Sequence, residues 1–238
     1  MAPEGHRLVS CDYSQVELRL LAHLSEDPEL VGAFQRDEDV HASTAAAIFG
    51  LPLGEITGDQ RALAKTINFG LMYGMSDYGL SARTDLSVDE ARLFIEAYFQ
   101  RFRRVRDYLD GTIEFAREHG YVQTIMGRRR YFPELREGSR VNASVARAAE
   151  RAAINMPIQG SAADIIKLAM IRLHDRLEQQ GLHARMVLQV HDELVLEVPE
   201  QELDQVCGLV VDTMESAYEL SIPLKVELSV GDNWMEIK

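Results

Sequence analysis

Residues 57–74 carry the pattern that most constrains what this chain can fold into. Side chains four apart on a helix lie one above the other, so a four-residue repeat predicts one stripe along a helix face. Two cations and then two aromatic rings follow that repeat: Arg61, Lys65, Phe69 and Tyr73. A nucleoside triphosphate has the same order, with anionic phosphates at one end and a flat base at the other. An amphipathic helix with snorkelling cations and buried rings also explains the stripe, and it is the favoured interpretation of the stripe alone.

Capping residues mark several helix ends. Thr57 with Gln60, and Ser87 with Glu90, have the spacing of capping boxes, in which each side chain satisfies a backbone N–H at the other residue. Gly74 suits the exit of the first of these helices. We predict helices over residues 14–24, 28–50, about 59–74, 87–102, 104–119, 140–180 and about 200–220, with a turn at 75–77.

Two carboxylates lie at the tips of predicted strands. Asp12 follows the apolar strand 7–11, and Asp192 lies in the turn of a hairpin over 184–198. A helix N-cap and ordinary turn chemistry are the competing interpretations of the two acids. If the tips meet in one sheet, the carboxylates repel unless a proton or cation lies between them, and magnesium accepts such oxygen ligands. A hairpin over 121–131 and a strand over 224–230 complete the predicted β structure.

Pro157 interrupts the long helical pattern. Proline inside a helix removes a hydrogen bond and clashes with the preceding turn, so we expect a break or kink near residues 155–160. That break would expose the amides of Asn155 and Gln159. With Arg151 they are spaced four apart on one face, which favours a binding role over loop solvation.

Composition limits the class of protein. The chain has 238 residues, 46% of them hydrophobic, so we expect a globular protein with a good core. We expect no membrane span and no secretory leader. The two cysteines, Cys11 and Cys207, lack CxxC spacing, which predicts no zinc site and a reducing, cytoplasmic location. The net charge of −13 argues against a purely electrostatic nucleic-acid binder, although arginines cluster within 101–106 and 128–130.

Three motifs together resemble one enzyme family. Residues 12–19 (DYSQVELR) resemble motif A of the family A DNA polymerases, the bacterial DNA polymerase I family. Residues 61–74 (RALAKTINFGLMYG) are similar to motif B on the mobile fingers helix, and residues 190–193 (VHDE) to motif C. The motifs occur in family order. The resemblance covers essentially the whole chain, including residues 127–130 (GRRR) and 155–160 (NMPIQG).

The resemblance implies template-directed DNA synthesis, in replication and repair, by a two-metal nucleotidyltransferase. Asp12 and Asp192 would hold two Mg²⁺ ions, for which Mn²⁺ can substitute, with the Tyr13 carbonyl as a further ligand. Glu193 would be a supporting acid rather than an obligatory ligand. Lys65 would act in catalysis as well as in binding.

The family also implies which residues touch the substrates. Deoxynucleoside triphosphate would be bound by Gln15, Glu17, His41, Arg61, Lys65, Phe69 and Tyr73, with Glu17 excluding a ribose 2′-hydroxyl. From the sequence around it, His41 could equally be an ordinary surface histidine. Primer-template DNA would be contacted by Arg151, Asn155, Gln159, Gln189 and His191.

The implied fold is α+β, a small antiparallel palm sheet flanked by helices, with a mostly helical fingers subdomain inserted. The expected boundaries are palm at 1–23 and 146–238 and fingers at 24–145. Cys11 and Ser161 depart from the family pattern, at a small apolar residue and a threonine respectively. Only a few residues precede motif A, so we expect a palm-and-fingers portion without thumb or exonuclease domains, to which a second chain could supply the thumb. The alternative is a folded fragment that binds nucleotide or DNA but is inactive.

Overall fold

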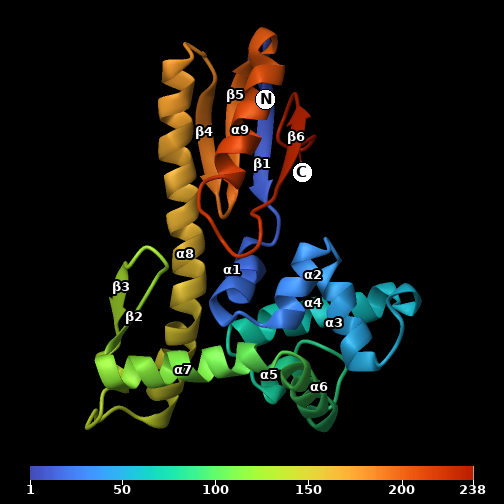
Figure 1. Ribbon diagram of the computed structural model, residues 1–238, viewed down its shortest axis with the longest axis vertical. Coiled ribbons are helices and arrows are strands. Elements are labelled where there is room, and N and C mark those ends of the chain that lie inside the picture. The colour runs from blue at the N-terminus through green and yellow to red at the C-terminus, as the bar shows by residue number, and fades with distance from the viewer. Residues whose placement is uncertain (238) are drawn as a thin grey trace. The chain divides into compact units, whose positions relative to one another are not determined.

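The computed structural model describes residues 1–237 and has the expected α+β fold (Figure 1). Its contacts divide the chain into two compact units. The first unit combines residues Met1–Val16 with the chain from Ala162 onward, and the second is the continuous stretch Glu17–Ser161. No helix within residues 1–237 is long and apolar enough to cross a membrane.

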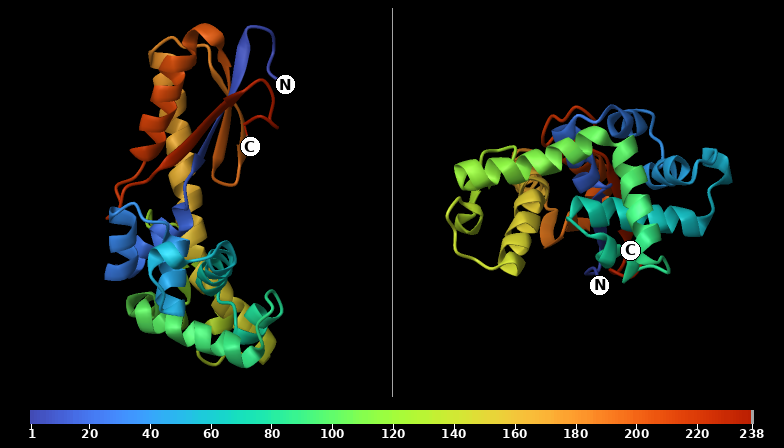
Figure 2. Two further views of the ribbon diagram at one scale, coloured as in Figure 1. Left: turned by 90° about the vertical axis from the view of Figure 1, so that its right-hand side faces the viewer. Right: turned by 90° about the horizontal axis from the view of Figure 1, so that it is seen from below.

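The first unit is built on a four-stranded antiparallel sheet with strand order β4-β5-β1-β6. β1 lies between strands that come from the far end of the sequence, and β6 (red) runs beside it (blue) in Figure 2. Helix α9 contacts β1, β5 and β6. The elements are β1 His6–Tyr13, β4 Arg185–Val190, β5 Glu193–Pro199, the 3-10 turn Glu200–Glu202, α9 Leu203–Glu215 and β6 Val226–Gly231.

The second unit is mostly helical. Helix α4 packs against α3, α3 and α5 against α6, and the small β2–β3 hairpin against α7 (Figure 1). The elements are α1 Val16–Ser25, α2 Pro28–Gln35, α3 Val40–Phe49, α4 Gly58–Met72, α5 Asp77–Ser81, α6 Val88–Arg101, α7 Arg103–His119, β2 Tyr121–Gln123 and β3 Arg129–Tyr131, with 3-10 turns at Leu53–Glu55 and Pro133–Leu135.

The predicted helix ends are confirmed where local chemistry fixes them. At the start of α4 the Thr57 hydroxyl accepts from the Gln60 N–H at 3.3 Å, and the Gln60 side chain accepts from the Thr57 N–H at 3.0 Å. A second capping box opens α6. Gly50 and Gly120 end α3 and α7 with φ values of 66° and 77°, which glycine adopts readily.

Two helix predictions were wrong in detail. The single helix expected over 28–50 is two helices, because the Asp39 carboxylate accepts from the N–H groups of His41 and Ala42 and starts α3 afresh. The turn expected at 75–77 leads directly into a further helix, α5, whose N-cap is Ser76. Both differences come from short polar caps within a run of helix-forming residues.

Of the break or kink expected near Pro157, the break is absent, because α8 runs without interruption over Ala143–Gln179. The kink stays a prediction. One proline deletes a single N–H, and the flanking helix is held by buried side chains on both sides, including Ala153 and Ile158. The Ser161 hydroxyl donates to the Pro157 carbonyl. Asn155 and Gln159 therefore lie on a helix face instead of in a loop.

Candidate functional site

Acidic side chains gather at one end of the sheet in the first unit. Asp12 lies inside β1, so it is not a helix cap, and its register partners are Glu193 on β5 and Glu227 on β6. The Tyr13 N–H donates to the Asp192 carbonyl at 3.3 Å, which fixes the β4–β5 turn beside β1. The sheet thus brings Asp12 close to Asp192 and Glu193, which follow it by 180 residues or more along the chain.

Burial and mutual repulsion disfavour ionisation of these acids. Partial burial, with Asp192, Glu193 and Glu227 nearby, raises the pKa of Asp12 to about 6. Burial also raises the pKa of Asp192, with a smaller contribution from Glu193. Glu193 is buried at 8% exposure, and its carboxylate accepts from the Ser10 hydroxyl at 2.6 Å. The hydrogen bond holds Glu193 in one orientation.

This acidic end has the chemistry that a hard divalent cation requires. A cation relieves the repulsion that raises the two aspartate pKa values, and carboxylate and carbonyl oxygens are its preferred ligands. Within residues 1–237 no group of three or more His, Cys, Asp or Glu side chains could hold a metal ion by itself. The donor set thus fits ions bound by Asp12 and Asp192 whose remaining ligands are backbone, water or phosphate oxygens.

Two residues beside the acids have strained backbones. Gln15 and His191 both have a φ of 54°, in the left-handed region that non-glycine residues rarely adopt. Gln15 follows β1, and its buried Oε1 atom has no hydrogen-bond partner among the described residues. The Gln189 amide donates to the His191 carbonyl at 2.5 Å, which ties the end of β4 to the turn. Strain and an unpartnered buried acceptor are typical of sites completed by a ligand.

The cation and aromatic stripe lies on α4 in the second unit. A hollow of about 570 Å³ is lined by Lys65, Phe69 and Tyr73 from α4, by Arg151 from α8, and by a further cation, Arg83. Three members of the stripe and one predicted DNA contact therefore share one surface. Arg83 was not predicted as a site residue, because it lies beyond the motif, just after α5.

Both ends of the stripe have acidic partners. The Arg61 guanidinium donates to the Asp39 carboxylate at 2.5 Å. The Tyr73 hydroxyl donates to the Glu17 carboxylate, so the proposed sugar-contacting acid is held against the aromatic end of the stripe. Asp39 was not predicted, although an acid two residues before His41 was visible as a helix-capping pattern.

His41 is not a surface histidine, because only 3% of it is exposed. Its ring lies 5.7 Å from that of Phe69, and its Nδ1 atom is 3.0 Å from the side-chain nitrogen of Asn68. Burial, together with the positive charges of Arg61 and Lys65, lowers the pKa of His41 to about 4, so the ring is neutral at pH 7. Asn68 was missed in the sequence, where only its position on the buried side of the motif could have indicated it.

The predicted DNA-contacting residues of α8 lie on one helix face. Arg151 and Gln159 are exposed, and Asn155 is half-buried with an Oδ1 atom that has no partner within residues 1–237. Arg151 also packs close to Gly74, where a Cβ atom would lie 2.9 Å from the arginine Cγ. The spacing predicted from the sequence is therefore present on an intact helix.

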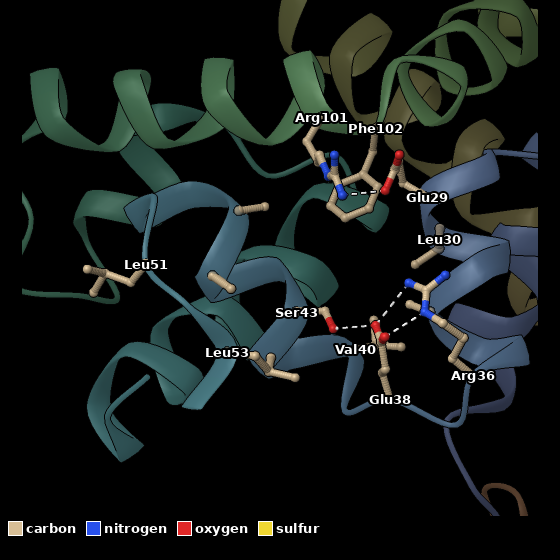
Figure 3. A pocket seen from close by; sticks show the side chains of 13 residues that line it. Glu29, Leu30, Arg36, Glu38, Val40, Ser43, Leu51, Leu53, Arg101 and Phe102 are labelled. Atoms are coloured by element: carbon tan, nitrogen blue, oxygen red, sulfur yellow. Dashed lines mark hydrogen bonds and ion pairs between the residues drawn. The ribbon is translucent and has the colours of Figure 1, made fainter. Parts of the chain in front are cut away.

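A separate hollow between α2, α3 and α6 contains none of the predicted residues (Figure 3). Its volume is about 360 Å³. Its charged side chains already pair with one another, Arg36 with Glu38 at 2.6 Å and Arg101 with Glu29. The apolar floor and neutralised rim are typical of a packing defect, and we assign this hollow no role.

A protein-family model described as DNA polymerase family A matches residues 1–236. The chain belongs to this family. Two DNA polymerases I are similar to the chain in sequence over all or nearly all of its length. The chain is 50% identical over 238 residues to the thermostable DNA polymerase I of Thermus aquaticus, covering 100% of this chain and 28% of the relative. It is 49% identical to DNA polymerase I of Pseudomonas aeruginosa, covering 99% of this chain and 26% of the relative.

A solved structure of the family has the same fold. The POL domain of Pol1 from M. smegmatis, in complex with DNA primer-template and dNTP, superposes with a TM-score of 0.94 at 46% identity. The match covers 99% of this chain and 41% of that one. The chain therefore corresponds to part of a family A polymerase domain, and it spans less than a third of the curated relatives' length.

Proposed function

We propose that this chain carries the catalytic core of a template-directed DNA polymerase, which adds deoxynucleotides to a primer 3′-hydroxyl. The observation that carries the proposal is the meeting of Asp12 and Asp192 at one end of the sheet, with raised pKa values for both carboxyls. The M. smegmatis relative with bound primer-template and dNTP supports these substrates. The expected palm at 1–23 and 146–238 and fingers at 24–145 are part of the proposal.

Asp12 and Asp192 would hold two Mg²⁺ ions, or Mn²⁺ in their place, with the Tyr13 carbonyl as a further ligand. When bound, the ions would lower the pKa of the primer hydroxyl and offset the charge of the departing pyrophosphate. Glu193 would be a supporting acid, and its hydrogen bond from the Ser10 hydroxyl, which orients its carboxyl group beside Asp12, supports this role. The three acids together would set the charge of the site and orient what binds there.

The α4 stripe would bind the incoming nucleotide. Lys65 and Arg61 would contact the phosphates, and Arg61 would exchange its ion pair with Asp39 for a phosphate oxygen. Gln15 would supply an amide, and its unpartnered Oε1 supports a ligand there. Phe69 would pack against the nucleotide, and Tyr73 would stand near the template base.

Glu17 would select the sugar. The hydroxyl of Tyr73 holds its carboxylate in one place, which supports a fixed steric barrier against a ribose 2′-hydroxyl. Glu17→Ala should raise the use of ribonucleotides relative to deoxynucleotides. The ratio of catalytic efficiencies for ribonucleotide and deoxynucleotide is measured in both chains. The same ratio in the variant and in the unsubstituted chain would show that Glu17 does not select the sugar.

Arginine, histidine and amide side chains would contact primer-template DNA. The Arg151 guanidinium can pair with a phosphate, and neutral amide side chains can form hydrogen bonds with base edges in a groove. The proposed contacts are Arg151, Asn155, Gln159, Gln189 and His191, and the buried unpartnered oxygen of Asn155 supports a donor from outside the chain.

Extension of a labelled primer tests the proposal directly. The 238-residue chain is incubated at low salt with primer-template, Mg²⁺ and four deoxynucleotides. Extension that is lost in Asp12→Asn and in Asp192→Asn supports the assignment. Near-normal extension by either folded variant would refute it.

A second candidate function follows from the coverage of 28% of the Thermus relative. A chain of this extent could bind nucleotide or DNA and yet need further protein, such as the relatives' remaining segments supplied on another chain, before it extends a primer. Titration of the chain with Mg²⁺ and a fluorescent deoxynucleotide separates the cases. Nucleotide binding without extension, restored to extension by an added thumb-containing fragment, would support this second function.

A further inference from the structure

Three buried polar side chains join α3 to α4. Asn68, on α4, is 1% exposed, and Thr44 and His41, on α3, are 0% and 3% exposed. The Asn68 side-chain nitrogen lies 3.0 Å from His41 Nδ1 and 3.1 Å from the Thr44 hydroxyl. Buried polar groups persist only when hydrogen-bonded, so these contacts restrict how each group can be oriented.

The hydroxyl of Thr44 determines which way the Asn68 amide faces. It has one hydrogen, and the Val40 carbonyl at 2.7 Å is nearer than the Asn68 carbonyl oxygen at 3.2 Å. Because the Thr44 hydroxyl donates its hydrogen to the Val40 carbonyl, its oxygen can only accept a hydrogen bond from Asn68. The Asn68 amide then donates one hydrogen to Thr44 and the other to His41 Nδ1, so both of its N–H bonds are used.

An Nδ1 atom that accepts a hydrogen bond carries no proton of its own. The ring proton of a neutral His41 must then lie on Nε2. Nε2 has no partner within residues 1–237 and is not among the buried unpartnered atoms, so this edge of the ring is open to ligand. Phe69 lies near the ring, and Asp39 and the two stripe cations act electrostatically on it, so the ring lies near the phosphate end of the stripe.

We propose that Asn68 is a positioning residue that holds His41 as the Nε2–H tautomer, so that this N–H donates to a phosphate oxygen of the incoming nucleotide. The inference rests on the proposed function for its ligand, but the tautomer itself is a property of the free chain. A neutral donor adds directionality beside two cations without adding a third charge. Because the amide is buried on the opposite side of the ring, the donor is oriented before nucleotide arrives.

Nitrogen NMR of histidine side chains tests the tautomer without activity. Chemical shifts of ¹⁵N-labelled histidine at pH 7.5 distinguish a bare Nδ1 from a protonated one, and loss of one signal set in His41→Gln assigns the resonances. We expect His41 to be almost wholly in the Nε2–H form. Asn68→Asp places an acceptor against Nδ1, so the proton should move to Nδ1 or the ring should become charged.

Asn68→Ser serves as a second variant in case the buried aspartate prevents folding. It removes the donor without adding charge, so a mixture of tautomers is expected. Ser25→Ala is the matched control, since it deletes another buried hydrogen bond of the second unit, from Ser25 to the Leu21 carbonyl at 2.7 Å. The control should leave the His41 signals unchanged.

Nucleotide affinity supplies the functional measurement. With Mg²⁺ and a deoxynucleoside triphosphate, Asn68→Asp in its Nδ1–H form should weaken binding by about tenfold, the scale of one hydrogen bond to a charged group. In the His41→Gln background the same change should have little further effect, because no imidazole ring remains for residue 68 to orient. Failure of the unsubstituted chain to bind nucleotide would refute the proposed function, whatever the tautomer is.

The Nδ1–H tautomer of His41 in the unsubstituted chain, or equal amounts of both forms, would overturn the positioning role. Additive losses of affinity in the double variant would also overturn it, since Asn68 would then act by a route that does not include His41. A folded Asn68→Asp chain could have the Nδ1–H tautomer and still bind nucleotide with normal affinity. That result would show that the Nε2–H donor does not contribute to binding, and it would reject the proposal.

Discussion

At Asp12 the metal binding that we propose opposes the stability of the fold. Its pKa of about 6 in the folded chain exceeds the ordinary value of 3.8, so the folded state binds more protons between these values. Stability contributed by this group is therefore present at low pH, falls as pH rises from about 4 to 6 and stays lost above pH 6. At neutral pH the Asp12 carboxylate is therefore destabilising unless a cation binds to it, as we propose.

Asp12→Asn should consequently raise the melting temperature at pH 7.5 without divalent ions while abolishing primer extension. We expect a rise of roughly 1–3 °C, discounted because the side chain is partly exposed. Mg²⁺ should stabilise the unsubstituted chain and not the variant. Asp175→Asn, at an exposed position of α8, is the control and should change neither property. A lower melting temperature for folded Asp12→Asn would contradict the repulsion.

At the scale of one element, the positions of Lys65 and Arg61 along α4 predict different effects of the two cations on the proposed reaction. Lys65 lies between Arg61 and Phe69, so it should face the phosphates whose charge grows as the bond breaks, which stabilises the transition state more than the ground state. Lys65→Ala should lower the maximal single-turnover rate by about 10²-fold and weaken nucleotide affinity. Arg61→Ala should weaken mainly affinity, by about tenfold.

Single-turnover extension over a range of nucleotide concentrations separates these two effects. Arg103→Ala, an exposed arginine of α7, should leave rate and affinity unchanged. If Lys65→Ala changed neither the rate nor the nucleotide affinity, the stripe would be an ordinary surface face of an amphipathic helix.

The exit of α4 depends on Gly74 for two reasons. Its φ of 71° is left-handed, and an added Cβ would lie 2.8 Å from the Ile154 side chain and 2.9 Å from that of Arg151. Gly74→Ala should lower the free energy of unfolding by about 1–3 kcal/mol. Gly111→Ala is the matched control in helix α7, where a Cβ meets nothing within 4 Å. It should raise that free energy by about 0.5–1 kcal/mol. Equal urea midpoints for the two variants would contradict this account.

Elements defined by local chemistry could be predicted from the sequence. The capping boxes at Thr57 and Ser87 act within three residues, so their helices begin where expected. The uninterrupted α8 at Pro157 could not be foreseen, because tertiary packing outweighs the lost hydrogen bond. The meeting of Asp12 and Asp192 was predicted from strand tips, whereas the role of Asn68 required knowing that α3 and α4 are neighbours.

At the scale of the whole molecule, a net charge of −13 opposes DNA binding. Only local clusters of arginine and lysine can neutralise phosphates, and each contact releases counterions, so affinity for a duplex should be weak and steeply salt-dependent. Arg151→Ala should reduce the magnitude of the log–log salt slope by about 1. Arg103→Ala serves again as the unaffected control.

Fluorescence anisotropy with a labelled primer-template between about 25 and 200 mM salt, an eightfold range, provides the measurement. Addition of a thumb-containing fragment should restore affinity if the gripping surface is supplied by further protein. Tight duplex binding by this chain alone, unchanged across the salt range, would contradict the prediction.

β1 begins the chain, but both of its neighbours in the sheet come from the last part of the sequence. At a translation rate of roughly 5–20 residues per second, Asp192 leaves the ribosome about 10–40 s after Asp12. The continuous second unit, by contrast, is complete once residue 161 has emerged. During synthesis the α4 stripe can therefore fold before Asp12 and Asp192 meet at the sheet.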